Sequence, residues 1–529
     1  MKSPFDHHSF FVVRLPYRPI NDLINQIDSY AKDSPGSYTA LLQSLLEQHW
    51  FEEALFLASP SLHATWQTEK SKTGELEPSL ADALWRYVFR SYGRATPYGL
   101  FAGLGVGTIG SKRQLDFDSH SWQTASRPDS ATLAAVSHTL AQNKAVRSGL
   151  HYRLNNSLYE VINQFRFSER SGTPLKSKIV LSSITSTPDL RKLVEQLREK
   201  GQLNYVKLTN LYGSDLQEEV DEYINALIDD QFLISNLSIP VTGLDMCTYL
   251  LDQLKSLPFK LPITTVLQAV QTNLGQSPID KEKLFQAQSL LQQALSQVDL
   301  PINQSDSLVQ TDLFLRPTRL QLDKSTIFQI ANQFNQVLPL LLFKHNSPLQ
   351  DFCAHFKERF DKQEVDLLTV LDPEVGIGFT NDTLSSYPIL ADLPFASKSD
   401  TSMGTDPIDH LREILYSRFL LDGRKEVVIT QNDINTVLKD QPHLRVATPP
   451  SWYVHGELFE PLASTNNPSH STEPVTSAYP DGWRFVLNST SGGSSAFFFG
   501  PVQTQDQAVI YYRPLPVGHS EVSYRAYAN

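Results

Sequence analysis

The first hundred residues alternate between the hydrophobic spacing of strands and that of helices. Residues 8–16 are β-branched and aromatic before a proline, which predicts a strand. Apolar residues recur every three or four positions over 21–33, 38–58 and 80–92, which predicts three helices. Small and apolar residues alternate over 98–109 and predict another strand. This part of the chain is therefore expected to mix helices with strands.

A different pattern begins at residue 152. The segments SLYEVI and FRF predict short strands, helices follow over 188–200 and 217–230, Gly201 ends the first helix, and FLIS at 232–235 predicts a strand. This order predicts a winged helix-turn-helix unit over 152–237. A DNA reader needs basic residues on its second helix, but this helix is acidic, so we interpret the unit as a protein-binding or scaffold element. The acidic residues are Glu218, Glu219, Asp221, Glu222, Asp229 and Asp230.

The rest of the chain continues the mixture. Residues 241–300 have helical spacing, 309–316 predict a strand, and helices resume over 325–360. A polar stretch at 396–407 predicts a loop, and the sequence after Lys425 is rich in strand-forming residues. Without an internal repeat, we expect an α+β protein of several subdomains over residues 1–529.

Composition and charge narrow the class of protein. Cys247 and Cys353 lack metal-ligand spacing, which fits a reducing cytoplasm better than a disulfide scaffold. No apolar run reaches the roughly 18 residues needed to cross a bilayer, and the N-terminus does not read as a signal peptide, so we expect no membrane insertion. The net charge of −12 argues against broad nucleic-acid binding, although a local basic pocket stays open.

One glycine pattern matches a cofactor-binding motif in spacing but not in its sequence context. Gly105, Gly107 and Gly110 have the GxGxxG spacing of a dinucleotide-binding turn. That turn must lead into a helix whose N-terminus holds the pyrophosphate, but the residues after Gly110 lack helical spacing. We therefore expect a tightly packed strand and no bound cofactor.

Three arginines mark a candidate anion site. Arg86, Arg90 and Arg94 are four residues apart, which places them on one face of a helix. Guanidinium groups suit carboxylates and phosphates because they pair with them through two hydrogen bonds. A solvated basic face near the helix C-terminus explains the same pattern, and spacing alone does not separate the two.

The run RSYGRATPYGLFAG at 90–103 resembles the signature of the N-terminal glutamylation domain of class I lanthipeptide dehydratases. Further segments resemble that family in the same order, so the resemblance covers nearly the whole chain. These segments are FFVVRLP with Arg14, SRPD with Asp129, RLNNSLY at 153–159, VQTD ending at Asp312, LDPEVGIGF at 371–379 and PPSWYVHGELF at 449–459.

The resemblance implies transfer of glutamate from glutamyl-tRNA, as co-substrate, to serine and threonine hydroxyls of a precursor peptide. It implies no metal or other bound cofactor. An arginine can hold a tRNA phosphate or stabilise an oxyanion, and an aspartate can accept the hydroxyl proton. Either aspartate could instead serve as a salt-bridge partner of the arginines. The implied catalytic residues are Arg14, Arg90, Arg94, Asp129 and Asp312, and the implied tRNA-binding residues are Arg86, Arg90 and Arg94.

The resemblance also implies partners. In the family a winged-helix unit binds the leader of the precursor peptide as an added strand, which assigns that role to 152–237 with SLYEVI or FRF as the edge. The core peptide enters the transfer site, and a separate elimination protein and a cyclase act later. We expect a bacterial cytoplasmic enzyme, with a homodimer as one option.

Two departures leave alternatives open. The family's domain normally continues past Asn529, which suggests a fragment or one half of a split system, and Ala95 stands where family members often carry serine or cysteine. The first alternative is an enzyme that adds an amino acid from tRNA to a peptide C-terminus. The second is a peptide-binding scaffold without catalysis.

Overall fold

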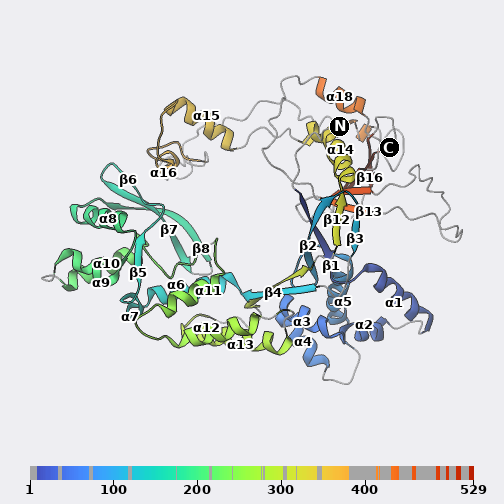
Figure 1. Ribbon diagram of the computed structural model, residues 1–529, viewed down its shortest axis with the longest axis horizontal. Coiled ribbons are helices and arrows are strands. Elements are labelled where there is room, and N and C mark those ends of the chain that lie inside the picture. Colours follow the sequence, from blue (N-terminus) through green and yellow to red (C-terminus); the bar gives the residue numbers. More distant parts are fainter. Residues whose placement is uncertain are drawn as a thin grey trace.

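The computed structural model describes most of the chain up to residue 379 and short segments beyond it (Figure 1). The predicted loop at 396–407 and the strand predicted at 426–430 lie outside the described residues. None of the described helices is long and apolar enough to cross a membrane. The described residues are 9–33, 38–70, 76–116, 122–173, 176–213, 217–240, 242–275, 277, 280–301, 307–316, 319–341, 348–379, 413–414, 416–417, 431–439, 456–459, 484–488, 496–499, 508–513 and 523–528.

A six-stranded sheet organises the first part of the chain. Its order is β3-β12-β2-β11-β4, and β1 also pairs with β2. β12 pairs with β2 at residues 108–110, β11 pairs with it at Leu104, and β1 pairs with it along residues 102–108. β2 is therefore central: it is antiparallel to β1 and parallel to both β11 and β12. The strands are β1 (Phe10–Pro16), β2 (Ala102–Gly110), β3 (Gln114–Asp116), β4 (Trp122–Pro128), β11 (Val309–Leu315) and β12 (Arg319–Asp323).

Glycines let β2 pack closely against its neighbours. A Cβ atom at Gly103 would lie 2.5 Å from the backbone oxygen of Leu313, and one at Gly107 would lie 2.2 Å from the ring of Phe11. The expectation of a packed strand in place of a dinucleotide-binding turn is confirmed, because these glycines lie inside β2. The strand is shorter than the predicted 98–109, since residues 98–101 form a turn.

Five helices form a cluster next to this sheet. They are α1 (Ile20–Asp33), α2 (Tyr38–Leu46), α3 (His49–Ala58), α4 (Pro60–Lys70) and α5 (Pro78–Gly93). In this cluster α3 and α5 contact the strands, and the others pack against α3 and α5. The single helix predicted over 38–58 is wrong, because Gln48 has extended backbone angles and separates α2 from α3. Leu42, Phe51, Leu84 and Phe101 are almost completely buried where these helices meet the sheet.

A second region of the fold contains α6 (Ser130–Gln142), α7 (Lys144–Arg147), and the small sheet β10-β5-β9 with its helices. Thr187 caps α8 by accepting a hydrogen bond from the Leu190 amide, and Gly201 ends it with a φ of 75°. The predicted helix 188–200 is therefore confirmed. The other elements are β5 (His151–Leu154), α8 (Pro188–Lys200), β9 (Leu203–Asn204), α9 (Tyr205–Thr209), α10 (Gln217–Asp229) and β10 (Leu233–Ser235).

A three-stranded sheet, β6-β7-β8, projects from this region. β6 spans Tyr159–Val161, β7 spans Gln164–Thr173 and β8 spans Lys176–Thr185. The sequence prediction missed β8. It also offered FRF as an edge strand, which is wrong, because Phe165 and Arg166 lie in β7 and pair with β6 on one side and β8 on the other.

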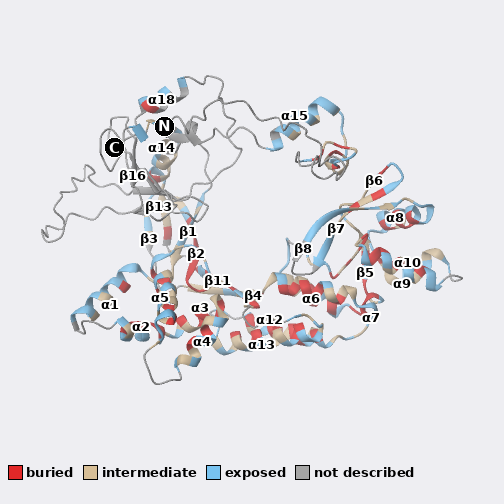
Figure 2. Ribbon diagram, turned by 180° about the vertical axis from the view of Figure 1, so that it is seen from behind, coloured by how far each residue is buried: buried red, intermediate tan, exposed pale blue. Residues whose placement is uncertain are grey.

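Helices α12 (Pro262–Leu274) and α13 (Lys281–Gln297) lie along the base of the molecule between the two regions (Figure 1). Helix α11 (Met246–Lys255) contacts α12 and α6. Buried residues recur every three or four positions along α12 and α13, where they form separate red patches in Figure 2. After β12 the chain forms α14 (Lys324–Leu341), α15 (Pro348–Phe360) and α16 (Leu367–Leu371). The later described elements are α18 (Gln431–Lys439), β13 (Gly456–Phe459), β14 (Arg484–Asn488), β15 (Ala496–Phe499), β16 (Ala508–Arg513) and β17 (Ser523–Ala528).

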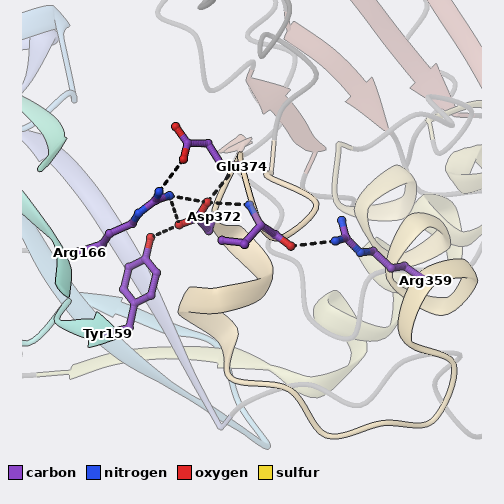
Figure 3. Close-up of polar contacts among 6 residues, drawn as sticks. Tyr159, Arg166, Arg359, Asp372 and Glu374 are labelled. Carbon is purple, nitrogen blue, oxygen red and sulfur yellow. Dashed lines mark hydrogen bonds and ion pairs between the residues drawn. The ribbon is translucent and has the colours of Figure 1, made fainter. Parts of the chain in front are cut away.

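The segment after α16 docks on β6 and β7 through a buried carboxylate (Figure 3). The side chain of Asp372 has no exposed surface and accepts hydrogen bonds from the Tyr159 hydroxyl (2.6 Å) and the Arg166 guanidinium (2.8 and 3.0 Å). Arg166 also pairs with the more exposed Glu374, and Arg359 donates to the Val375 carbonyl oxygen at 2.8 Å. The LDPE residues singled out by resemblance therefore have a structural role here.

Candidate functional site

A pocket of about 320 Å³ opens where β2, β11, α3 and the turn after α5 meet. These elements come from distant parts of the sequence, so the pocket exists only in the folded chain. Its lining includes Ala58, Tyr98, Leu104, Asp129, Gln310 and Asp312.

The turn after α5 brings Tyr98 to the pocket. The helix ends at Gly93, and Thr96-Pro97 cannot continue it because proline disfavours helical angles in the residue before it. Gly99 adopts a φ of 53°, and the Phe101 amide donates to the Tyr98 carbonyl oxygen at 3.0 Å. The Tyr98 hydroxyl donates to the Ala58 carbonyl oxygen at 3.0 Å, which fixes the ring against the pocket wall.

Arg90 lies over this ring. Its guanidinium carbon is 4.3 Å from the centre of the Tyr98 ring, within the range of a cation–π contact. Its Nε is buried and has no hydrogen-bond partner among the described residues. Burial and the positive charge of Arg94 lower the pKa of Arg90. A guanidinium that is half-buried beside a like charge is well placed to bind an external anion.

The other two arginines of the predicted helix face are exposed. Arg94 caps the C-terminus of α5, where its amide donates to the Arg90 carbonyl oxygen at 3.1 Å. Arg86 lies one turn before Arg90, further from Tyr98 along the helix. The predicted set therefore consists of one half-buried arginine beside the pocket with an exposed arginine on each side of it.

Asp312 and Arg127 form an ion pair across the sheet. Asp312 lies on β11, Arg127 lies on β4, and the Arg127 Nη1 is 2.6 Å from the Asp312 Oδ2. Each side chain is more than a third exposed, so the pair contributes little to stability. Asp312 therefore pairs with Arg127, outside the predicted arginine set, and forms no ion pair with the predicted arginines among the described residues.

Asp129 caps helix α6 from the opposite end of the pocket. Its Oδ2 accepts from the Thr132 amide at 2.9 Å and the Thr132 hydroxyl at 3.2 Å. Asp129 is therefore not the salt-bridge partner of an arginine in the described structure. Both bonds use the same oxygen, so the Oδ1 atom has no hydrogen bond among the described residues and can accept one from a ligand.

Arg14 lies on the pocket side of the sheet. It pairs in register with Leu104, which lines the pocket, and directly paired residues point to the same face of an antiparallel sheet. Arg14 is exposed and has no ion pair in the part of the chain that the structure describes. The fold thus brings Asp129 and Asp312 into the pocket lining, places Arg90 beside the pocket on the Tyr98 ring, and places Arg14 on the same sheet face.

Sequence reasoning missed two residues of this site. Tyr98 was part of the quoted TPYG run, but its contact with Arg90 depends on the turn after α5. Arg127 is part of the SRPD motif, but it lies 185 residues before Asp312 in the sequence. Their pairing therefore depends on the fold. Asn155 of RLNNSLY has a structural role, because its amide donates to the carbonyl oxygens of Ser168 and Gln231 at 2.9 Å.

The site has no metal-binding geometry in the described structure. Within the described ranges, no group of three or more histidine, cysteine, aspartate or glutamate side chains could hold a metal ion. The available chemistry is that of arginine, aspartate and tyrosine: anion binding, hydrogen bonding and proton transfer.

Comparison with known proteins defines the class. The chain belongs to the family described as lantibiotic dehydratase, N terminus, which it matches over residues 47–465. It resembles the solved structure of the tRNA-dependent lantibiotic dehydratase MibB from Microbispora sp. 107891, with a TM-score of 0.59 and 19% identity over 86% of this chain and 42% of that one. This likeness concerns the fold alone and confirms the predicted α+β class. The predicted family is confirmed by the family match over residues 47–465.

Among curated relatives, the chain is 25% identical to the subtilin biosynthesis protein SpaB of Bacillus subtilis over 82% of its own length. It is 24% identical to the nisin biosynthesis protein NisB of Lactococcus lactis over 66%, and 21% identical to the epidermin biosynthesis protein EpiB of Staphylococcus epidermidis over 87%. The chain spans only 41%, 34% and 44% of these relatives.

Proposed function

We propose that this chain transfers glutamate from glutamyl-tRNA to serine and threonine hydroxyls of a precursor peptide in the cytoplasm. The observation that carries the proposal is the pocket itself. It combines two carboxylates, Asp129 and Asp312, with the neighbouring Arg90, whose buried Nε lacks a protein partner among the described residues. Membership of the lantibiotic dehydratase family supports this reading of the pocket.

The chemistry divides among the residues of the pocket. Arg90 and Arg94 hold a phosphate near the 3′ end of the tRNA through charge-assisted hydrogen bonds. Arg127 or Arg14, on the sheet face, receives the side-chain carboxylate of the glutamyl group. The peptide hydroxyl attacks the ester carbonyl and loses its proton to the Oδ1 atom of Asp129, while a guanidinium stabilises the oxyanion. The ester bond to the tRNA then breaks, the ribose oxygen leaves with the proton returned from Asp129, and the glutamylated peptide and the free tRNA are released.

The unit at 152–237 is proposed to bind the leader of the precursor peptide as an added strand. β6 and β8 each pair with β7 on one side only among the described strands, and β8 is the better edge because it has ten residues where β6 has three. Its Ile179, Val180 and Leu181 are exposed by 75%, 40% and 47%, which is unusual for three consecutive apolar residues. An extended peptide with alternating apolar residues would cover them while it completes the backbone hydrogen bonds of the edge.

The transfer step is tested by incubating the chain with its precursor peptide and glutamyl-tRNA and measuring the peptide by mass spectrometry. The wild-type chain is expected to add glutamyl groups, and Arg90→Ala and Arg94→Ala are expected to abolish the addition. Lys255→Ala removes an exposed cation from the last turn of α11, outside the pocket and the 152–237 unit, and serves as the control with full activity. Full activity in both pocket variants would overturn the assignment of the pocket.

Leader recognition is tested separately by hydrogen exchange. Addition of leader peptide is expected to protect backbone amides within residues 176–185. Ile179→Asp should weaken leader binding, because it places a charge where the apolar contact is proposed. Arg90→Ala should leave leader binding unchanged, since recognition and transfer occupy different regions. Protection confined to residues outside 152–237 would contradict this part of the proposal.

A further inference from the structure

Two aromatic side chains stack on the outer surface of α5. The ring centres of Trp85 and Phe89 are 5.4 Å apart with an angle of 28° between the ring planes. Phe89 is 51% exposed, although phenylalanine is among the residues most often buried. Trp85 is half-buried against the core and therefore supports Phe89 from behind. The pair presents one free aromatic surface to solvent.

Gly93 leaves that surface uncovered. Helical side chains lean toward the N-terminus, so a side chain at 93 would lie over the residue four positions earlier, Phe89. The backbone does not require glycine here, because Gly93 has no positive φ. Packing does not require it either, since an added Cβ would meet only the Ile20 Cδ1 atom, at an ordinary distance of 3.8 Å.

The charges around the pair are positive. Arg86 lies three residues before Phe89, so the two are neighbours on the helix surface, and Arg90 and Arg94 continue the row toward the pocket. None of these three arginines forms an ion pair with a described carboxylate, and Asp82, one turn before Arg86, is not paired with it. On a chain with a net charge of −12, this strip complements an anion that also has flat apolar faces.

We propose that Phe89, backed by Trp85, is a stacking platform for an unpaired base near the 3′ end of the acceptor tRNA. Single-stranded nucleic acid binds where aromatic rings alternate with cations, because bases stack on the rings while the cations meet the phosphates. Phe89 and Arg94 are separated by about 7.5 Å along the helix axis, which is the span of one or two nucleotides. This inference rests on the proposed function, since the aminoacylated terminal nucleotide must enter the pocket beside Tyr98.

The test measures the affinity of the full chain for glutamate-specific tRNA. Phe89→Leu keeps an apolar side chain and removes the ring, and the Kd is expected to rise roughly 10-fold. Phe89→Tyr restores a ring and should restore the affinity. Tyr38→Leu removes an aromatic residue that is 57% exposed on α2, and this control should bind like the wild type. The melting temperature should stay unchanged in each variant.

A trimmed tRNA that lacks its unpaired 3′ nucleotides locates the contact. Wild-type affinity should fall with this probe, and Phe89→Leu should then cause no further loss, because both changes remove the same stack. Equal losses from Phe89→Leu with intact and trimmed tRNA would overturn the inference. So would an unchanged Kd with intact tRNA, including the case where Phe89→Leu instead converts a dimer of this chain to a monomer.

The inference and the proposed function fail in different ways. A wild-type chain that transfers glutamate, together with a Phe89→Leu variant that has normal tRNA affinity and a normal KM, would overturn only the platform. A wild-type chain that neither binds glutamyl-tRNA nor transfers glutamate would overturn the proposed function, and the platform with it.

Discussion

Arginines that are buried or half-buried occur in both regions of the molecule, but they have different surroundings. In the region of the small sheets, Arg147 donates to Asn225 and Gln142 at 2.6 Å and pairs with Asp229, and Arg166 pairs with Asp372 and Glu374. In the region of the six-stranded sheet, Arg90 has an aromatic ring beneath it and Arg94 beside it. Carboxylates pair with Arg147 and Arg166, whereas no described carboxylate pairs with Arg90.

The difference separates structural arginines from ligand-binding ones. Moving a guanidinium out of water is costly unless hydrogen bonds and an opposite charge replace the solvent. The Arg166 cluster satisfies that requirement within the protein and fixes two segments more than 200 residues apart. The buried Nε atom of Arg90 has no hydrogen-bond partner among the described residues. Binding of an external anion therefore stabilises the charged guanidinium.

The largest expected effect on stability comes from Asp372. Asp372→Ala removes a carboxylate with no exposed surface and leaves Arg166 short of its main partner, which should cost about 3–5 kcal/mol in the free energy of unfolding. Glu374→Ala removes the exposed carboxylate that pairs with the same arginine and should cost at most about 1 kcal/mol. Chemical denaturation measures both. Equal losses in the free energy of unfolding of the two variants would contradict the expectation that the buried carboxylate matters more than the exposed one.

The arginines beside the pocket should show the opposite behaviour. Arg90→Ala and Arg94→Ala each relieve a repulsion between two cations, so the free energy of unfolding should change little or rise. The affinity for glutamyl-tRNA should fall by roughly 10- to 100-fold, because each variant removes a charge-assisted bond of about 1.5–3 kcal/mol. Denaturation and tRNA titration of the same samples test this pattern. A strongly destabilised Arg90→Ala would show that this arginine is structural after all.

Asp129 allows its two roles to be separated. Asp129→Ala removes the cap of α6 and should cost about 1 kcal/mol of stability. Asp129→Asn keeps a capping oxygen but removes the basic carboxylate, so its stability should match the wild type while glutamyl transfer is lost. Transfer rates and denaturation curves of both variants check this. Transfer that survives in Asp129→Asn would leave Asp129 as a cap only.

The smallest expected effect is a dependence on pH that is confined to acid. Hydrogen bonds from Tyr159, Arg166 and two backbone amides outweigh burial and lower the pKa of Asp372. A carboxyl whose folded pKa lies below its unfolded value of about 3.9 stabilises the fold above that value. That stabilisation is lost as the pH falls through the folded pKa. Wild-type melting temperature should therefore drop more steeply below about pH 4 than that of Asp372→Asn; parallel curves would contradict this.

Local signals account for the parts of the fold that were predicted well. Thr187, Pro188 and Gly201 define both ends of α8, because capping and a left-handed residue are properties of short segments. β8 was missed because its apolar residues Ile179, Val180 and Leu181 face solvent at an edge, which leaves no alternation between buried and polar positions.

The sequence predicted one part of the candidate site and not the other. Arg90, Arg94 and Tyr98 lie within nine residues, so one motif identified their neighbourhood. The pairing of Asp312 with Arg127 depends on strand register between β4 and β11, and the partner of Asp129 turned out to be the amide of its own helix. Sequence spacing predicts neither contact. The Asp312–Arg127 ion pair forms only in the folded sheet, and the Asp129 carboxylate could have paired with any nearby cation instead of the helix amide.

The most direct measurement is a structure of the chain bound to a stable glutamyl-adenosine 5′-phosphate with an amide in place of the ester. The glutamyl group is expected in the pocket between Tyr98, Asp129 and Asp312, with the phosphate in contact with Arg90 and Arg94. The arrangement of Arg166 and Asp372 should stay unchanged, because that cluster is already satisfied. Density for the ligand at another surface, with Arg90 free of the phosphate, would contradict the assignment of this pocket.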